Sequence, residues 1–500
     1  MKLRINLFLF VFTLLFTSCN KSEINNKPNV IFIIADDLGY ADIGVYGSSF
    51  YDTPNIDALI KKGVQFTNGY SNSPVCSPAR ASFQTGKYPI KTGVTDWIKG
   101  RKAYQGTTQN DRWIVPETDY ELKQEEVTIA EKLKENGYKT IFSGKWHLGE
   151  DEKFWPEKHG YDINIGGWKV GSPNKRKGFN GYFSPYGNPR LKDGPIGEYL
   201  PDRLTDEAIK VLKQEEGKPF FLCLSYYLVH APFQAKEADI KIYDNKRLVD
   251  NIENSPEFLE PQLWMKSATG KSSSYKERIK QGHPTYAAMV KSLDDNVGRL
   301  INYLKESNNY ENSLIVFVSD NGGLSTSEGS PTSNLPLAKG KGWMKEGGIR
   351  VPFFIKTPNQ KNGLVSETPV SGIDIFPTIL EYVNISNSIN IDGVSLKKTI
   401  ENPLKITDRP IFWHYPHYSN QGGNPSSAIR LGNYKLIHDI ETETYELYNL
   451  KNDIGENSNL IDEEPKVATL LKDQLKEYIT TNYKKSFRVN PNWNQIDITQ

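Results

Sequence analysis

The sequence of 500 residues is poor in cysteine, with only three, and each of them lies in a different setting. Cys19 follows an apolar N-terminal run, Cys223 lies inside an apolar segment, and Cys76 lies among serine, proline and arginine. Because no obvious disulfide pair exists, the fold must depend on its core for stability. A zinc site is not indicated, since no cluster of cysteine and histidine has suitable spacing. Cys223 is typical of a small buried hydrophobic residue, whereas Cys76 either is a buried thiol or has a chemical role.

The chain also has no excess of charge of one sign. Its 61 lysines and arginines balance 60 aspartates and glutamates, which gives a formal net charge of +1. A protein that coats nucleic acid or an anionic membrane surface needs a strong positive excess, so neither class of partner is indicated. Any anionic substrate must instead be recognised by cations gathered at one site. The apolar fraction of 37%, arranged in patterned segments, indicates a globular protein.

The N-terminus carries an apolar run that is too short to span a bilayer comfortably. A basic start at residues 1–4 precedes this run at residues 7–16, and small residues and Cys19 follow at once. The segment Phe-Thr-Ser-Cys at residues 16–19 resembles a bacterial lipobox, whose cysteine is acylated and becomes the new N-terminus. Residues 20–27 would then be a tether, and the lipid would be the only contact with a membrane. An ordinary cleaved signal peptide is the alternative, and both predict export to the periplasm or the cell surface.

Segments typical of buried strands and of amphipathic helices alternate along the chain. The strand-like runs are rich in β-branched and aromatic residues; they are residues 28–35, 140–143, 219–228 and 313–319. The helix-like segments have apolar periodicity or terminal capping signals; they are residues 54–62, 127–136 and 285–305. This alternation predicts an α/β fold with a large mixed, mostly parallel sheet sandwiched by helices.

The pattern changes from about residue 384 onward. Residues 434–438 and 445–450 alternate like antiparallel strands with one exposed face, and residues 466–479 have the pattern of an amphipathic helix. We therefore expect a smaller α+β subdomain, with an antiparallel sheet and a helix, that contributes to the pocket. Residues 244–283 are rich in polar residues and are expected to be a surface insertion. The predicted organisation is a lipoprotein signal peptide at 1–19, a tether at 20–27, a catalytic domain at 28–383, the C-terminal subdomain at 384–485 and a tail at 486–500.

Side chains capable of catalysis or metal binding follow all four predicted strands. They are Asp36 and Asp37 after the first strand, Lys145 and His147 after the second, His230 after the third, and Asp320 and Asn321 after the fourth. Because open α/β sheets bind ligands at the carboxyl edge of their strands, we expect these side chains to converge on one pocket. The aspartates and the asparagine offer only oxygen ligands, which suits a hard cation such as calcium. Taken alone, Asp-Asp is often a helix cap, and Asp-Asn-Gly-Gly is an ordinary tight turn.

The segment Cys-Ser-Pro-Ala-Arg at residues 76–80 matches the signal at which type I sulfatases have their cysteine oxidised to formylglycine. Other segments match the same family in the expected order, over residues 28 to 460; they are residues 36–37, 53–55, 144–149, 320–323 and 346–352. The sequence therefore resembles the formylglycine-dependent, arylsulfatase-like sulfatases of the alkaline phosphatase superfamily, of the polysaccharide-degrading bacterial lipoprotein type. The resemblance implies a sulfuric ester hydrolase.

The resemblance also implies a cofactor and a maturation step. Ca²⁺ would be bound by the carboxylates, the amide and the modified cysteine; these ligands are Asp36, Asp37, Asp320, Asn321 and Cys76. A formylglycine-generating enzyme would act on Cys76 as a maturation partner. The hydrated aldehyde would carry two hydroxyls on one carbon, and one of them would lose its proton to Asp320 and attack sulfur.

Further catalytic roles are implied by the same resemblance. Lys145 and Lys341 would contact the sulfate, and Arg80 would hold the formylglycine. His230 would protonate the departing alcohol oxygen, and His147 would take the proton of the second hydroxyl, so that the intermediate collapses to sulfate and aldehyde. Lys339 is the alternative to Lys341, which we prefer because the glycines that follow it preserve the family spacing; Lys339 would then be a charge at the pocket rim.

The substrate is less well defined by the sequence. Aromatic planes beside Arg or His suit a pyranose ring, and the candidate residues are Trp97, Arg101, His414 and His417. Trp97 could equally be a core aromatic residue. We expect exo-acting hydrolysis of sulfate esters on oligosaccharides from an algal polysaccharide such as ulvan or a sulfated galactan, with glycosaminoglycan fragments as the alternative.

Three other functions remain open at this point. A phosphoester or phosphonate hydrolase of the same superfamily would share the carboxylates, but Asn321 in place of a histidine and the pair Lys145 and Lys341 argue against it. A non-catalytic, glycan-binding lipoprotein would be expected to have lost Cys76, Asp320 or His230, and none is lost. A sulfotransferase-like transfer of sulfate to an acceptor alcohol would differ only in its product.

Overall fold

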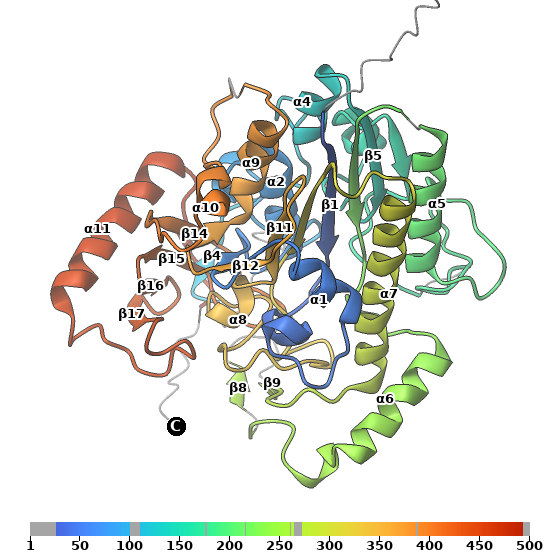
Figure 1. The fold of residues 1–500 in the computed structure, drawn as a ribbon. Coiled ribbons are helices and arrows are strands. Elements are labelled where there is room, and N and C mark those ends of the chain that lie inside the picture. The colour runs from blue at the N-terminus through green and yellow to red at the C-terminus, as the bar shows by residue number, and fades with distance from the viewer. Residues whose placement is uncertain are drawn as a thin grey trace, which may run out of the picture.

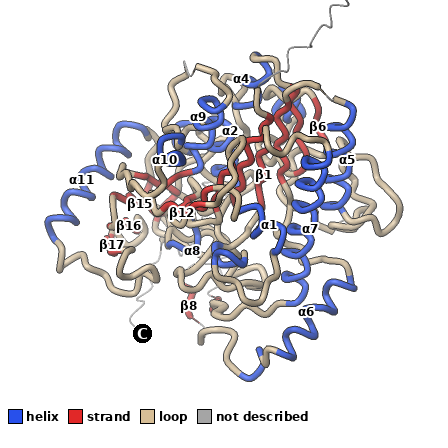
Figure 2. Tube along the Cα trace, in the orientation of Figure 1, coloured by secondary structure: helices blue, strands red, loops and turns tan. Residues whose placement is uncertain are grey.

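The computed structural model describes residues 27–100, 111–175, 178–215, 217–260, 262–264, 273–386 and 389–493. An eight-stranded sheet lies at its centre with helices on both faces (Figures 1 and 2). Every neighbouring pair in this sheet is parallel, except that β11 runs antiparallel to both of its neighbours. The strands, in spatial order, are β12 (Leu364–Ser366), β2 (Val64–Phe66), β11 (Phe353–Lys356), β10 (Ser313–Ser319), β1 (Asn29–Ala35), β7 (Phe220–Ser225), β5 (Lys139–Gly144) and β6 (Ile163–Ile165). The predicted mixed, mostly parallel sheet is confirmed.

Both faces of this sheet are buried, which explains why its strands are continuous apolar runs rather than alternating ones. On β1, Ile31 and Ile33 belong to one core cluster, and Phe32 and Ile34 belong to the other. The first cluster is completed by side chains of α1 (Pro54–Ile60), α5 (Leu200–Gln214) and α7 (Pro284–Glu306). The second is completed by α2 (Cys76–Thr85), α4 (Ile129–Glu135) and α9 (Ile375–Tyr382). The domain thus has three layers, helices, sheet and helices.

The helices begin where local signals place them. Thr128 caps α4 by accepting a hydrogen bond from the backbone of Glu131, whose side chain accepts one in return from the Thr128 backbone. Proline occupies the first turn of α1 and of α7, where a missing backbone N–H costs nothing. The predicted helices at 54–62, 127–136 and 285–305 are therefore found within a few residues of their expected ends.

A second, four-stranded antiparallel sheet forms the smaller C-terminal part of the molecule. Its strands, in spatial order, are β14 (Ile411–Tyr415), β15 (Ser426–Leu431), β16 (Tyr434–Asp439) and β17 (Thr444–Asn449). Helix α11 (Pro465–Asn482) covers one face, with Leu471 and Leu475 packed on the sheet (Figure 1). The opposite face packs against the larger domain through Trp413, Ile437 and Tyr448. This arrangement matches the expected antiparallel sheet with a covering helix.

The remaining elements are short or peripheral. The helices are α3 (Pro89–Thr92), α6 (Glu237–Val249), α8 (Glu346–Ile349) and α10 (Lys397–Glu401), and 3₁₀ turns span Tyr40–Asp42, Gly44–Tyr46, Glu152–Phe154, Pro156–Lys158, Ile252–Asn254 and Gly372–Asp374. Three two-stranded pairs are formed by β3 (Gly69–Tyr70) with β13 (Val370–Ser371), β4 (Trp113–Ile114) with β18 (Arg488–Val489), and β8 (Gln262–Trp264) with β9 (Ser273–Tyr275). Among the described residues, no helix has both the length and the apolar character needed to cross a bilayer.

Candidate active site

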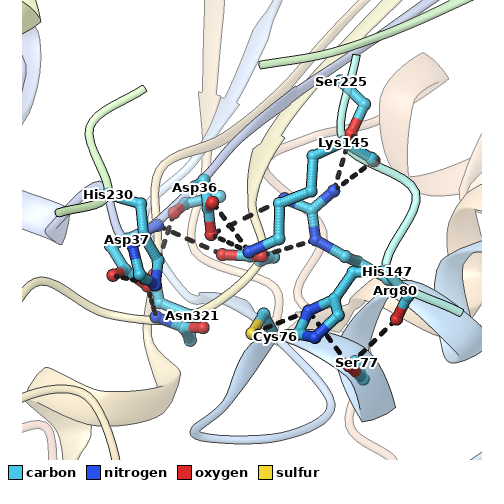
Figure 3. A network of polar contacts seen from close by, with 12 residues as sticks. Asp36, Asp37, Cys76, Ser77, Arg80, Lys145, His147, Ser225, His230 and Asn321 are labelled. Atoms are coloured by element: carbon cyan, nitrogen blue, oxygen red, sulfur yellow. Dashed lines mark hydrogen bonds and ion pairs between the residues drawn. The ribbon is translucent and has the colours of Figure 1, made fainter. Parts of the chain in front are cut away.

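The polar residues that follow the strands meet at one edge of the large sheet. Asp36 and Asp37 follow β1, and Asp320 and Asn321 follow β10, which pairs with β1 in register. On the other side of β1 lies β7, and β5, which ends at Gly144 just before Lys145, pairs with β7. Figure 3 shows these side chains gathered around the end of the sheet. The convergence expected from the sequence is what the chain topology produces.

Three buried carboxylates form the floor of this site. Asp36, Asp37 and Asp320 each offer an oxygen, and these oxygens lie within 4.8 Å of one another. The amide nitrogen of Asn321 donates to Asp37 Oδ1 over 2.8 Å, whereas Asn321 Oδ1 is buried and has no hydrogen-bond partner among the described residues. Three carboxylates with an unpartnered amide oxygen form an all-oxygen donor set, which fits a hard divalent cation. This cluster could therefore hold a metal ion.

Three cations balance the charge of these carboxylates. Lys145 Nζ lies 2.7 Å from Asp36 Oδ2, Lys341 Nζ lies 2.8 Å from Asp37 Oδ1, and Arg80 Nε donates to Asp320 Oδ2 over 2.7 Å. Burial alone would raise the pKa of Asp320, but the charges of Arg80, Lys145 and Lys341 together outweigh it and hold that pKa below its usual value. Both lysines are flexible point charges, so either could turn to an anionic ligand if a cation took over the carboxylates.

Of the three buried carboxylates, Asp36 has the least favourable negative charge. Burial raises the pKa of this carboxyl well above its usual range in spite of Lys145, and the neighbouring Asp320 and Asp37 raise it further. A bound cation would remove this penalty, because it favours the ionised form of every carboxylate that it contacts.

Cys76 is the first residue of α2 and lies beside this cluster. Its Sγ is 3.6 Å from His147 Nδ1, and every residue of α2 is buried. Burial raises the pKa of the Cys76 thiol, although Lys145 and Lys341 oppose the shift. Since only the thiolate is a strong nucleophile, the unmodified cysteine is poorly activated near neutral pH.

The ring of His147 is oriented by the protein. Its Nε2 lies 3.2 Å from the backbone oxygen of Ile98, which can only accept a hydrogen bond, so Nε2 carries the proton. Nδ1 is then the free base, and it lies 3.2 Å from Ser77 Oγ as well as near Cys76 Sγ. Burial, assisted by Lys145 and Arg80, lowers the pKa of His147 well below its usual value. The imidazole is therefore neutral, with its basic nitrogen directed at position 76.

His230 lies on the other side of the carboxylates (Figure 3). Its Nδ1 is 2.7 Å from the backbone oxygen of Ala231, so Nδ1 carries a proton and Nε2 is free. Nε2 lies 3.6 Å from Asp37 Oδ2. Burial and the Lys341 charge lower the pKa of His230, an effect that Asp37 partly offsets.

These groups open into a cavity of about 500 Å³. Its lining includes Cys76, His147, His230 and Lys341. Trp97, which we expected from the sequence to contact the substrate, also lines it. Further lining residues were not expected from the sequence, since they come from loops without a recognisable motif; among them are Lys99, Lys169, Glu328, Asn420 and Gln421. Ser77 and Ser225, which orient His147 and Arg80, were also missed, although Ser77 lies inside the motif at residues 76–80.

Other candidate residues lie away from the cavity or outside the described residues. His414 and His417 are buried and do not line it. His414 Nδ1 pairs with Ser427 Oγ over 2.7 Å, and His417 Nε2 pairs with Thr95 Oγ1 over 2.9 Å, so both rings support packing. Lys339 binds Glu277 over 2.6 Å and does not line the cavity either. Arg101 and Cys19 lie outside the described residues.

The family of the chain follows from its match to a family model. A family model described as Sulfatase matches residues 28–385. The chain belongs to the sulfatase family. A second model, described as N-sulphoglucosamine sulphohydrolase, C-terminal, matches residues 339–485 of this sulfatase.

Known relatives agree with this assignment. The sulfatase is 29% identical to a "Sulfatase" of Formosa agariphila, over 92% of this chain and 89% of the relative. It is 30% identical to the N-acetylgalactosamine-6-sulfatase of Canis lupus familiaris, over 84% of this chain and 73% of the relative. A crystal structure of Ps i-CgsB in complex with k-i-k-neocarrahexaose superposes with a TM-score of 0.72 and 29% identity, over 94% of this chain and 95% of that chain. The protein is thus an enzyme that hydrolyses sulfate esters.

Proposed function

We propose that this sulfatase hydrolyses sulfate esters of carbohydrates, with Cys76 oxidised to formylglycine and a Ca²⁺ ion beside it. One observation carries the proposal: Cys76 lies at the base of a cavity beside three buried carboxylates, two lysines and two histidines. Such a site offers a nucleophile position, an anion-binding group and proton carriers at both sides of a single tetrahedral anion.

The chemistry of the donor set supports calcium. Asp36, Asp37, Asp320 and the free oxygen of Asn321 would hold the ion, with an oxygen of the modified residue 76 completing the shell. When bound, the ion would lower the pKa of a hydroxyl at position 76 and neutralise charge on the sulfate oxygens. Lys145 and Lys341 would then be released from Asp36 and Asp37 to bind the sulfate ester.

An aldehyde at position 76 supplies what the thiol cannot. Its hydrate carries two hydroxyls on one carbon, so that one attacks sulfur and the other later expels sulfate with return of the aldehyde. The raised pKa of the buried Cys76 thiol supports the need for this conversion. The conversion in turn requires a formylglycine-generating enzyme as a maturation partner.

The protein groups around position 76 would move the protons. Asp320 would accept the proton of the attacking hydroxyl, and Arg80 would hold this carboxylate and the modified residue in place. His230 would protonate the departing alcohol oxygen through its free Nε2. His147, whose free Nδ1 faces position 76, would take the proton of the second hydroxyl.

Relatives and cavity lining support a carbohydrate substrate. The compared proteins include an N-acetylgalactosamine-6-sulfatase and Ps i-CgsB in complex with k-i-k-neocarrahexaose. Trp97, at the wall of the cavity, offers an aromatic plane for a pyranose ring. We favour exo-acting hydrolysis on oligosaccharides of an algal polysaccharide such as ulvan or a sulfated galactan, with glycosaminoglycan fragments as the second candidate.

We also propose that the enzyme is exported and anchored by a lipid on Cys19, at the periplasm or the cell surface. The lipobox-like segment at residues 16–19 supports this location. A Cys19→Ala variant should then leave the membrane fraction, whereas the native protein should need detergent for release.

The function is tested by sulfate release from desalted algal and animal oligosaccharides, alongside 4-nitrophenyl sulfate and 4-nitrophenyl phosphate. We expect sulfate from at least one oligosaccharide class and faster turnover of the aryl sulfate than of the aryl phosphate. A preference for the phosphate ester would instead favour the phosphoester hydrolases, whose fold is shared by the phosphonate monoester hydrolase of Agrobacterium radiobacter at 18% identity.

A further inference from the structure

The cavity has positive charge beyond the lysines that contact the carboxylates. Lys99 and Lys169 line it together with Lys341. Neither residue belongs to a motif of the sulfatase family found in the sequence, and neither is needed for the proposed reaction. Their position therefore calls for a separate explanation.

Both lysines come from segments that hold His147 in place. The carbonyl of Ile98, the residue before Lys99, accepts the hydrogen bond of His147 Nε2. The carbonyl of Trp168, the residue before Lys169, accepts a hydrogen bond of 3.2 Å from the backbone of His147. A methyl group added to Gly171 would lie only 2.4 Å from the His147 ring, so this second segment lies directly against the imidazole. The backbone at Lys99 and at Lys169 therefore lies next to His147, and both residues line the cavity.

Lys169 differs from the other cations of the site in its pairing. Lys145, Lys341 and Arg80 each face a buried carboxylate at 2.8 Å or less. Lys99 forms an exposed pair with Glu150, with 3.3 Å between Nζ and Oε2. Lys169 is half-buried and forms no ion pair within the described part of the chain. Since partial burial of an unpaired ammonium is unfavourable, an anionic group of a ligand would recover free energy here.

Acceptor oxygens line the cavity near His230 and Lys341. Glu328 lies near Lys341 and His230, whose pKa values it affects, and it accepts a hydrogen bond of 2.6 Å from Gln421 Nε2. Asn420 Oδ1 is buried there without a hydrogen-bond partner among the described residues. These oxygens can accept hydrogen bonds from sugar hydroxyls, whereas a second anion beside Glu328 would be repelled. His147 and His230 flank position 76 from different sides (Figure 3).

We propose that Lys169, supported by Lys99, forms a subsite for a second anionic group of the substrate, either a carboxylate or another sulfate ester. This inference rests on the proposed function, because it assumes a sugar already held by its scissile sulfate. The expected substrate is therefore a sugar with two negatively charged groups. The second charged group would lie toward His147, and the sugar hydroxyls would lie toward Glu328. A charge-assisted contact of this kind selects for the dianionic ligand and disfavours neutral neighbours.

The test measures binding independently of turnover. Calcium-loaded Cys76→Ala protein is titrated by calorimetry with three disaccharides that share one sulfate ester: one monosulfated, one with a second sulfate, and one with a uronate carboxylate. We expect at least one dianionic sugar to bind about tenfold more tightly than the monosulfated sugar, as a charged hydrogen bond would give. The arm that shows the preference identifies the second anion as sulfate or carboxylate.

Matched variants assign the preference to Lys169. In the Cys76→Ala background, Lys169→Met should reduce the preference for the dianionic sugar to about twofold or less, and Lys169→Arg should keep most of this preference. Lys241→Met removes the same charge on the exposed surface of α6, far from the cavity, and should leave the preference for the dianionic sugar unchanged. Equal affinity for all three sugars, or a full preference in Lys169→Met, would overturn the subsite. Failure of the wild-type enzyme to hydrolyse 4-nitrophenyl sulfate, assayed in parallel, would instead contradict the proposed function.

Discussion

At the scale of single residues, the surroundings of Cys76 disfavour a reaction by its thiolate. Burial raises its pKa, and the nearest base, His147 Nδ1, is held in a neutral ring 3.6 Å away. A site built for a cysteine nucleophile would lower that pKa instead. In the proposed reaction Asp320, whose pKa is held below its usual value, would instead accept the proton of a hydroxyl nucleophile.

Loss of the Cys76 side chain should remove the reaction while leaving the fold intact. We expect Cys76→Ala to lower kcat for 4-nitrophenyl sulfate by about three orders of magnitude or more, since a covalent nucleophile is lost. Cys223→Ala is the matched control, because Cys223 is buried in β7 and does not line the cavity. Comparable activity of the two variants would show that position 76 is not the nucleophile.

His414 and His417 should make the protein sensitive to acid. Burial lowers the pKa of each ring to about 3, whereas an unfolded histidine has its ordinary pKa. The unfolded state therefore binds more protons below pH 6.5 or so, and stability must fall as the pH drops. At pH 5 we expect a loss of about 2 kcal/mol per histidine relative to neutral pH.

Urea unfolding at pH 7.5 and at pH 5 measures this loss. His417→Gln can keep the hydrogen bond to Thr95 without titrating, so the loss of stability between pH 7.5 and pH 5 should be smaller by about 2 kcal/mol in this variant. His438→Gln, at a half-buried position, should change the dependence less. If His417→Gln has the same pH dependence as the native protein, His417 is not the acid-sensitive group.

At the scale of elements, the small sheet is joined to the segment that carries Lys341. Lys435 in β16 lies 2.9 Å from a carboxylate oxygen of Glu346, at the start of α8, and 2.9 Å from one of Glu456. All three side chains are fully buried. Tyr70 and Arg350 also donate to Glu346, so this carboxylate is held from both domains. The contacts fix the start of α8, a few residues after Lys341.

Lys435→Met should destabilise the protein strongly, because it leaves two buried carboxylates facing each other. We expect the free energy of unfolding to fall by about 3 to 5 kcal/mol. Lys345→Met removes a lysine that pairs with the partly exposed Glu446 and should cost about 1 kcal/mol or less. Denaturant unfolding of both variants gives the comparison, and equal losses would contradict a special role of the buried network.

The elements show how far the sequence could predict the structure. The long apolar runs predicted β1, β5, β7 and β10, because parallel strands buried on both faces need apolar residues at every position. The residues after these strands could be placed together, since parallel strands share one carboxyl edge. His414 and His417 were expected near a substrate but are buried. His414 lies in a sheet that is packed on both faces, and sequence alternation does not show which face is covered. His417 lies just after this strand and is held by Thr95, a contact between residues far apart in the chain.

The sequence could not predict which loop residues line the cavity. Lys169 and Glu328 reach the cavity only because their segments are held by distant contacts, such as that of Gly171 with His147 and that of Gln421 with Glu328. Such contacts join residues far apart in the chain and leave no local pattern. Ser225, which accepts a hydrogen bond from Arg80, likewise has no signal beyond its place at the end of β7.

At the scale of the whole molecule, an ion at the carboxylates should couple activity to stability. Any ligand that binds only the folded state stabilises it, by about 3 kcal/mol at a free concentration 100 times the dissociation constant. We therefore expect EGTA to lower the melting temperature and abolish sulfate release, and added Ca²⁺ to restore both. Because Lys145 and Lys341 can neutralise Asp36 and Asp37, the protein without the ion should remain folded.

Mg²⁺ is the matched control for this experiment. It demands a tighter octahedral shell and gives up its water reluctantly, so it should restore less stability and less activity than Ca²⁺. Unchanged melting temperature on addition of Ca²⁺ to the EGTA-treated protein would contradict a calcium site at these carboxylates.

Position 76 should react as an oxidised side chain beside the carboxylate cluster. The most direct measurement is the mass of the peptide that contains residue 76, taken from active enzyme purified from its native host. We expect the mass of an aldehyde at this position, in a proportion that follows the specific activity of the preparation. Fully active enzyme whose peptide carries only an intact cysteine thiol would contradict this expectation.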